Sequence, residues 1–219
     1  MADKTVAFIP IKLNNQRLPN KNILPIGGKP ACSYIFDTLK DTNGIDEKYV
    51  FCSDEKILPY IPQGIKFLKR EQWLDGFEVK GLQIIESFVN TVDADIYVLT
   101  HVTSPFLKPR SIEIALDKVK NEGYDSAFTV EKMQNYCWYQ GKPINYDLQD
   151  IVTTQNLEPV YQETGGFFIF RKEVFIKHHR RIGLNPYMHV LDTFEGVDID
   201  TKEDYDFAQV VANFLSDYR

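Results

Sequence analysis

The chain has 219 residues, with 25 lysines and arginines against 31 aspartates and glutamates, so its formal net charge is −6. This length suits one α/β domain, and 43% hydrophobic residues are enough for a core. An acidic chain without a long basic run argues against nucleic-acid binding and against a membrane surface. An anionic ligand would therefore need a local cluster of cations.

Short apolar runs alternate with amphipathic stretches along the chain. The predicted strands are, in chain order, residues 6–10, 49–52, 65–68, 96–100, 126–130 and 166–170. The predicted helices are residues 31–40, 81–92, 110–121 and 202–217. This alternation predicts a doubly wound, mostly parallel α/β sheet in a single domain over residues 1–219. Such sheets bind ligands beyond the carboxyl ends of their strands, which directs attention to the loops after Pro10, Cys52 and Thr100.

Residues 134–164 break this rhythm. The stretch has no clean period but is rich in aromatic side chains, namely Tyr136, Trp138, Tyr139, Tyr146 and Tyr161. Exposed aromatic residues in an inserted segment favour an interface, although they could also pack on their own domain. We therefore expect an inserted arm that forms a homodimer.

The cysteines and the chain's N-terminal residues bear on its location. Cys32, Cys52 and Cys137 form no C-x-x-C pair, which argues against a disulfide framework or a zinc site and fits a reducing compartment. No apolar run approaches the ~18 residues of a membrane span. Residues 1–5 are too short and polar for a secretory signal, so we expect a cytoplasmic protein.

The loop after the first predicted strand, residues 11–22, concentrates cations. Lys12, Arg17 and Lys21 alternate with small polar residues, and the loop leads into residues 27–30, GGKP. Cations and backbone N–H groups in such a loop suit a triphosphate, because they neutralise its charge and cradle its oxygens. The P-loop pattern G-x-x-x-x-G-K-[ST] is absent. These residues alone leave open a phosphate site or a solvated basic loop.

Further motifs follow in order. The chain carries R-L-P-N-K-N at 17–22 and G-K-P at 28–30, then Y-V-F-C-S-D at 49–54, L-T-H-V-T-S-P-F at 99–106, T-G-G-F-F-I-F at 164–170 and G-V-D-I-D-T-K-E-D at 196–204. This series resembles the cytidylyltransferase family, which includes the synthetases of CMP-sialic acid, CMP-Kdo and related CMP-nonulosonates. The resemblance covers nearly the whole chain, so the chain is identified as a member of that family.

The resemblance implies a Rossmann-like nucleotidyltransferase fold and attack of an acceptor oxyanion on the α-phosphorus of CTP, which releases pyrophosphate. Such a transfer depends on positioning and charge neutralisation. Lys12, Arg17 and Lys21 would hold the triphosphate as the catalytic cations. The other nucleotide-binding residues that it implies are Asn15, Gln16, Asn22, Lys69, Arg70 and Lys80.

Asp198 and Asp200 are the predicted metal ligands. They lie two positions apart, so on a straight strand their side chains would share a face. Carboxylates suit Mg²⁺ (or Mn²⁺), which would draw charge from the α-phosphate. The segment also resembles a helix start, because Thr201 precedes Glu203 and Asp204. Both roles are compatible if Thr201 caps the last helix.

The acceptor is expected to contact His101, Thr103, Gln162 and Thr164. His101 stands where sialate synthetases usually have glutamine, and Lys12 stands where the family usually has arginine. His101 could be a cation, an acid/base group or only a hydrogen-bonding residue. The turn-forming role of residues 103–105 is an equally open reading of Thr103.

The arm also departs from the family. Residues 153–162 carry no cation, although sialate enzymes place basic residues there to meet the sugar carboxylate, and Trp138 stands where a lysine is expected. The acceptor pocket should therefore differ from a sialate pocket. Lys80, Lys142 and Arg171 are the cations expected nearby.

These features predict transfer of CMP to a small anionic acceptor, foremost a nonulosonate-type acidic sugar in capsule or lipopolysaccharide precursor synthesis. A phosphorylated amino-acid derivative such as phosphoglutamine, or a phosphonate, is the alternative acceptor and would give a CDP- or CMP-linked product. A metal-dependent glycosyltransferase would carry its acidic pair near mid-chain. A non-catalytic relative would not be expected to retain Lys21, Asp198 and Asp200 together.

Overall fold

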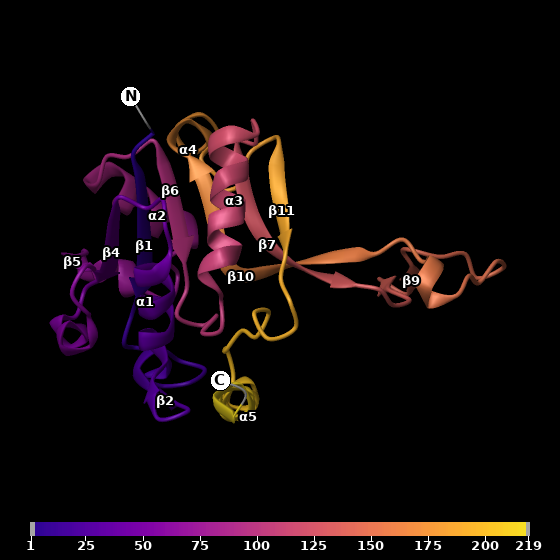
Figure 1. Cartoon of the computed structure of the whole chain (residues 1–219), viewed down its shortest axis with the longest axis horizontal. Coiled ribbons are helices and arrows are strands. Elements are labelled where there is room, and N and C mark those ends of the chain that lie inside the picture. Colours follow the sequence, from indigo (N-terminus) through magenta and orange to yellow (C-terminus); the bar gives the residue numbers. More distant parts are fainter. Residues whose placement is uncertain (1–2, 218–219) are drawn as a thin grey trace.

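The computed structural model describes residues 3–217, which are organised around a seven-stranded sheet of order β11-β7-β10-β6-β1-β4-β5 (Figure 1). Its strands are β1 (Thr5–Ile11), β4 (Glu47–Cys52), β5 (Lys66–Lys69), β6 (Ile96–Thr100), β7 (Ser126–Met133), β10 (Val160–Arg171) and β11 (Pro186–Val190). Strand β10 runs antiparallel to both β6 and β7, and the other neighbouring pairs are parallel. The mostly parallel sheet is thus confirmed.

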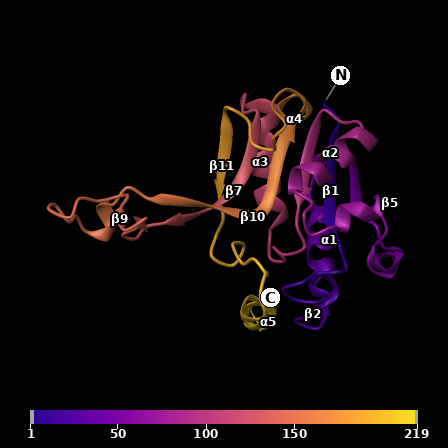
Figure 2. The same cartoon turned by 180° about the vertical axis from the view of Figure 1, so that it is seen from behind.

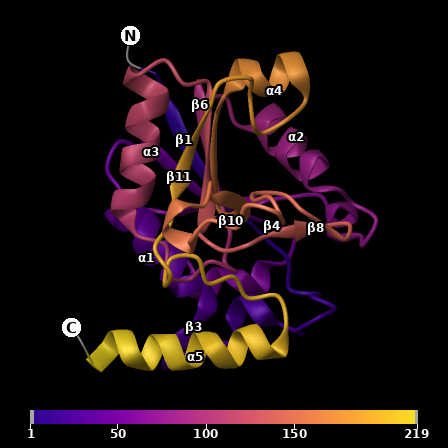
Figure 3. The ribbon, with the colours of Figure 1, turned by 90° about the vertical axis from the view of Figure 1, so that its right-hand side faces the viewer.

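Helices cover both faces of the sheet, which confirms the doubly wound arrangement (Figure 3). Helices α1 (Ala31–Asp41) and α3 (Pro109–Asn121) lie on one face, and α2 (Gly81–Thr91) and α4 (Lys172–His178) lie on the other. The helices bury separate clusters because each sheet face is apolar. On the α2 side, the Phe8 and Phe88 rings stack with their centroids 4.1 Å apart.

The carboxyl ends of β1, β4 and β6 lie together at one end of the sheet, because these strands are parallel neighbours. Helix α5 (Lys202–Asp217) lies beyond this end of the sheet, next to the hairpin of β2 (Pro25–Ile26) and β3 (Lys29–Pro30) (Figure 1). Its buried face includes Ala208 and Val211, and the Gln209 side-chain amide donates to the Pro25 carbonyl at 2.8 Å. The last helix therefore closes the end of the sheet where a ligand is expected.

The sequence did not predict α4, β11 or several short elements. Strand β11 is an edge strand whose only buried residue is His189, so it lacks an apolar run. Helix α4 is a single short helix with two buried residues. The other short elements are β2 (Pro25–Ile26), β3 (Lys29–Pro30), β8 (Trp138–Tyr139), β9 (Lys142–Pro143), η1 (Lys21–Ile23), η2 (Glu55–Tyr60), η3 (Gln72–Asp75) and η4 (Thr154–Asn156).

The segment expected as an arm leaves the sheet as an extension of β7 and β10. Val160 pairs with Met133 and Glu163 with Val130, so β10 begins earlier than the predicted strand 166–170. Beyond this ladder the chain forms the β8–β9 hairpin, which stands clear of the sheet in front and back views (Figures 1 and 2). The arm leaves the sheet at the end where the parallel strands have their carboxyl ends. No helix within residues 3–217 has the length and apolar character needed to cross a lipid bilayer.

Candidate functional site

A cleft of about 210 Å³ opens at the carboxyl ends of β1 and β6. Helix α2 and the two strands supply its apolar wall, through Pro10, Ile84, Ile85 and Leu99. The polar side chains that line it are Lys12, Asn15, Lys21, Asn22, Arg70, His101, Thr103 and Arg181. Seven of these eight were expected from the sequence, and they come from three separate segments, namely the first loop, the end of β5 and the segment after β6.

A smaller hollow adjoins the cleft and is formed by the first loop. It shares Lys12, Asn15 and Lys21 with the cleft and adds Gln16 and Arg17. The loop is closed by the buried Asn22, whose amide donates to the Lys12 carbonyl at 2.7 Å. Hence the fold brings the three loop cations together, and Asn22 shapes the loop as well as lining the cleft.

Asp200 joins this loop to the C-terminal segment. Its carboxylate lies 2.8 Å from the Lys21 amine and 2.7 Å from the Arg17 guanidinium. The Lys21 amine also donates to the Ile199 carbonyl at 3.0 Å. Burial by itself would raise the pKa of Asp200, but the hydrogen bonds and charges of Lys21 and Arg17 hold it below its usual range. Asp200 and two of the loop cations, Arg17 and Lys21, therefore form one electrostatic unit.

The two aspartates have different surroundings. Asp198 is exposed and has no hydrogen bond or ion pair with another described residue, whereas Asp200 is paired. The segment is not the sheet strand that was expected, yet burial alternates along it, with Val197 and Ile199 inside. Ile199 is fixed by its N–H, which donates to the Thr103 carbonyl at 2.9 Å.

Within residues 3–217, no group of three or more His, Cys, Asp or Glu side chains is arranged to hold a metal. Two carboxylates nevertheless fit Mg²⁺, which commonly takes its remaining ligands from phosphate oxygens and water. Asp198 has an unengaged carboxylate for this purpose. The helix-start role of the same segment is also present, because Asp204 accepts from the Thr201 N–H at 2.8 Å and from the Asp200 N–H at 3.0 Å.

His101 follows the last residue of β6 and lines the cleft. Its Nδ1 lies 2.7 Å from the Gly165 carbonyl oxygen, which can only accept, so Nδ1 carries the proton. Burial lowers the pKa of His101 despite this hydrogen bond, which favours the neutral imidazole. The reading of His101 as a cation is therefore disfavoured, and its Nε2 is left as an acceptor.

Arg70 is the buried cation of the cleft. Its guanidinium pairs with Asp75, which also accepts from the Ser53 hydroxyl. The Arg70 Nε has no hydrogen-bond partner among the described residues. Lys69 is exposed on the opposite side of the chain and pairs with Glu55 at 2.6 Å, so of the two adjacent cations only Arg70 lines the cleft.

The remaining predicted residues lie outside the cleft lining. Lys80 is exposed at the start of α2. Gln162 is exposed at the root of the arm, opposite Glu131. The Thr164 hydroxyl donates to the Thr129 hydroxyl at 2.7 Å. These residues were expected from the family resemblance, which does not reveal the direction of a side chain on a strand or at a helix end.

The two other cations expected near the acceptor are placed elsewhere. Arg171 pairs with Asp3 at 2.9 Å and donates to the Val119 carbonyl. Strand β10 is antiparallel to β6, so the carboxyl end of β10 points away from the cleft and Arg171 lies at the opposite end of the sheet. The expectation for Arg171 is therefore wrong. Lys142 is exposed in the β8–β9 hairpin of the arm.

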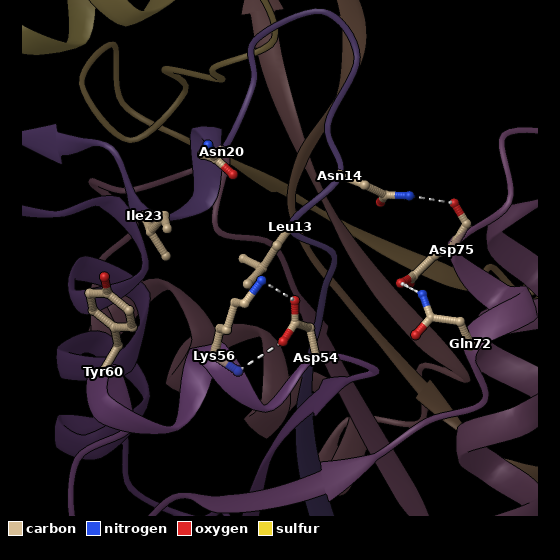
Figure 4. Close-up of a pocket in the computed structure, with 9 residues that line it drawn as sticks. All are labelled: Leu13, Asn14, Asn20, Ile23, Asp54, Lys56, Tyr60, Gln72 and Asp75. Carbon is tan, nitrogen blue, oxygen red and sulfur yellow. Dashed lines mark hydrogen bonds and ion pairs between the residues drawn. The ribbon is translucent and has the colours of Figure 1, made fainter.

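Another hollow, of about 370 Å³, lies beside the first loop (Figure 4). It is lined by Leu13, Asn14, Asn20, Ile23, Asp54, Lys56, Tyr60, Gln72 and Asp75. Asp54 starts η2 by accepting from the Lys56 N–H at 2.9 Å, and the Lys56 amine lies 4.0 Å from the same carboxylate. This hollow is larger than the cleft but contains none of the loop cations, so it lacks the charge that a triphosphate needs.

The neutral state of His101 has a measurable consequence for stability. Because its folded pKa lies below the ordinary value of about 6.5, the unfolded chain binds the proton more readily, and stability falls as pH drops through about 6.5. Glutamine can still donate to the Gly165 carbonyl but does not titrate. We expect His101→Gln to lose less stability than the unmodified protein between about pH 7.5 and about pH 5.5, measured by urea unfolding.

The exposed His178 provides the control, and His178→Gln should retain the pH dependence of the unmodified protein. His189, whose pKa is also lowered by burial, stays in both proteins and cannot account for a difference. An equal loss of stability in His101→Gln and the unmodified protein would contradict the lowered pKa of His101.

Known proteins resemble this chain in sequence and in fold. The chain is 24% identical to the N-acylneuraminate cytidylyltransferase of Streptococcus agalactiae serotype III, over 98% of this chain and 54% of that protein. It is 21% identical to the pseudaminic acid cytidylyltransferase of Campylobacter jejuni, over 95% of this chain and 96% of that protein. The chain thus spans about half the length of the N-acylneuraminate relatives that it matches.

A solved structure of CMP:2-keto-3-deoxy-manno-octonic acid synthetase complexed with CTP superposes with a TM-score of 0.72 at 17% identity, covering 98% of this chain and 99% of that chain. At this identity the likeness establishes the fold. The family profile described as Cytidylyltransferase matches residues 6–213, which is nearly the whole chain. The chain therefore belongs to the cytidylyltransferase family.

Proposed function

We propose that this chain is a cytidylyltransferase that transfers CMP from CTP to a small acidic acceptor and releases pyrophosphate. The observation that carries the proposal is the junction of the loop cations with Asp200 at the mouth of the cleft. A cluster of cations beside an acidic pair suits a metal–triphosphate, and the activities that name the relatives support the same reaction.

In this proposal the chain acts by positioning and by charge neutralisation. Lys12, Arg17 and Lys21 hold the triphosphate oxygens and stabilise the charge that builds up on the leaving pyrophosphate. Asn15, Gln16 and Asn22 fix the nucleotide, with Asn22 acting partly through the loop. The buried Arg70 has an unpartnered Nε–H that can donate to the base, so it is the residue proposed to contact cytosine.

Asp198 and Asp200 are proposed to hold Mg²⁺ or Mn²⁺. Such an ion supplies charge withdrawal from the α-phosphate and orients it. Lys21 and Arg17 contribute by keeping Asp200 ionised and by fixing its carboxylate beside the phosphate loop.

The acceptor is proposed to be a nonulosonate-type sugar acid, and the pathway the synthesis of a capsule or lipopolysaccharide precursor in the cytoplasm. Support comes from the relatives, whose names give N-acylneuraminate, 3-deoxy-manno-octulosonate and pseudaminic acid. His101 and Thr103 line the part of the cleft left for this acceptor. The cation-free stretch 153–162 favours a phosphorylated or phosphonate acceptor as the second candidate.

The direct test is pyrophosphate release with CTP or UTP, Mg²⁺ and a panel of acceptors. The panel holds N-acetylneuraminic acid, pseudaminic acid, Kdo, phosphoglutamine and a phosphonate. We expect release only with CTP, a divalent metal and an acidic acceptor, and loss of release on adding a chelator. The proposed function fails if no acceptor supports release or if UTP replaces CTP fully.

Asp198 allows a clean test of the metal site. Because it has no partner among the described residues, Asp198→Asn should leave the urea midpoint unchanged while lowering kcat/KM at least about tenfold, since one charged ligand is lost. Asp206→Asn, an exposed residue on α5 that pairs with Lys202, is the matched control and should keep full activity. Full activity of Asp198→Asn would remove Asp198 from the metal site.

We also propose that residues 134–164 of the single domain 1–219 form the contact of a homodimer. Tyr139, Ile144 and Ile151 are each more than half exposed on the arm, although Trp138 and Tyr136 pack edge-on against Tyr146 within it. Such exposed apolar side chains on a projecting hairpin suit burial against a second copy.

Light scattering after size-exclusion chromatography should give twice the chain mass of 25.4 kDa. The double variant Tyr139→Arg, Ile151→Arg should shift the mass to that of one chain, because two charges would be buried in the contact. The control Ile176→Arg alters an equally exposed apolar residue on α4 and should stay dimeric. A dimer that survives the double variant would place the interface elsewhere.

A further inference from the structure

We infer that Arg181 forms an anion subsite that binds the carboxylate or phosphate of the acceptor, an inference that rests on the proposed function. Arg181 belongs to the segment between α4 and β11, neither of which was predicted. It lines the same cleft as Lys21, His101 and Thr103. No motif of the chain includes it, so only the folded structure brings it to the site.

The other cations of the cleft lie in the first loop or beside Asp75. Arg70 is buried against Asp75, and Lys21 is held by Asp200. Lys12 belongs to the first-loop hollow together with Arg17. Burial lowers the pKa of His101, which makes it a poor cation. Among the described residues that line the cleft, Arg181 is therefore the cation that lies neither in the first loop nor against Asp75. The protein as a whole has a net charge of −6.

The position of Arg181 is defined by an aromatic ring. Its guanidinium carbon lies 3.5 Å from the centroid of the Phe168 ring, which is 1% exposed and therefore rigid. His101 meets the same ring edge-on, at a centroid distance of 6.2 Å. Stacking on a ring leaves the in-plane N–H donors of a guanidinium available, which suits a fork-like contact with a carboxylate or phosphate. Phe168 therefore places Arg181 and His101 at one end of the cleft.

The present partner of Arg181 is compatible with a ligand. Its Nη2 donates to Glu163 at 3.0 Å, and both side chains are partly exposed, at 33% and 46%. Exposed ion pairs contribute little stability, and a guanidinium has five donors, so Arg181 can bind an anion while keeping or exchanging Glu163. Glu163 lies in the ladder at the root of the arm, so this pair also links the arm to the acceptor end of the cleft.

The segment that carries Arg181 is fastened on both sides. Before it, α4 ends and His179 adopts a left-handed conformation at φ 51°, with its ring against Phe175. After it, the Gly183 N–H donates to the Ser126 hydroxyl at 2.8 Å, and Asp125 accepts from the Leu184 N–H at 2.7 Å. A cation on an anchored loop loses less conformational freedom when it binds an anion, so the subsite is preorganised.

The test compares Arg181→Ala and Arg181→Lys with the unmodified protein in pyrophosphate release, with CTP and acceptor varied separately. We expect Arg181→Ala to raise the KM of the acidic acceptor at least about tenfold while changing the KM of CTP less than about twofold. Arg181→Lys should restore part of the loss, because the charge remains but the fork is gone. The control Arg110→Ala removes an exposed arginine on α3 and should change neither KM.

Sialic acid, pseudaminic acid and Kdo probe the carboxylate source, and a phosphonate that carries no carboxyl group probes the phosphate source. If an acid is turned over and Arg181→Ala leaves its KM unchanged, the subsite is refuted while the proposed function stands. If no acceptor is turned over, the proposed function fails, and binding of the same acids in the presence of CTP and Ca²⁺, followed by saturation-transfer NMR, decides the subsite. Binding that Arg181→Ala abolishes supports it, and no binding to the unmodified protein refutes it.

Discussion

The contact of Asp200 with Lys21 and Arg17 connects parts of the chain that are almost 180 positions apart. Three cations in one short loop repel one another, and a carboxylate beside two of them offsets that repulsion. The contact also fixes the loop against the segment that carries Asp198. The end of the cleft that carries the first loop therefore depends on an interaction between the beginning and the end of the chain.

Packing of the last helix maintains this contact. Tyr205 and Gln209 on α5 both donate to the Pro25 carbonyl, and Ala212 lies so close to Gly27 that a Cβ at that glycine would meet it at 2.9 Å. At the other end of the segment, the Ile199 N–H donates to the Thr103 carbonyl after β6. The two aspartates are thus held between a helix and the central sheet, rather than on a sheet strand of their own.

The end of the cleft where His101 lies depends on an irregularity in β10. Its pairing with β7 shifts register between Glu163 and Phe168, and there the Gly165 carbonyl meets the His101 ring. Gly166 has no room for a side chain, because a Cβ would lie 2.9 Å from the Thr129 hydroxyl. The bulge lets one strand support the cleft, where Phe168 packs behind His101 and Arg181, and also form one side of the arm, through Glu163.

The sequence by itself determined the fold class and identified the cation-rich first loop and the acidic pair. Strong apolar runs and helical periods are local signals, and the motifs around Lys21, Asn22 and Asp200 are contiguous in the chain. Tertiary structure alone decided that Arg70 rather than Lys69 faces the cleft, that Arg171 lies at the far end of the sheet, and that Arg181 lies beside His101. These outcomes depend on the direction of β10 in the sheet, on the loop that follows β5 and on contacts between distant segments. None of these produces a periodic pattern in the sequence.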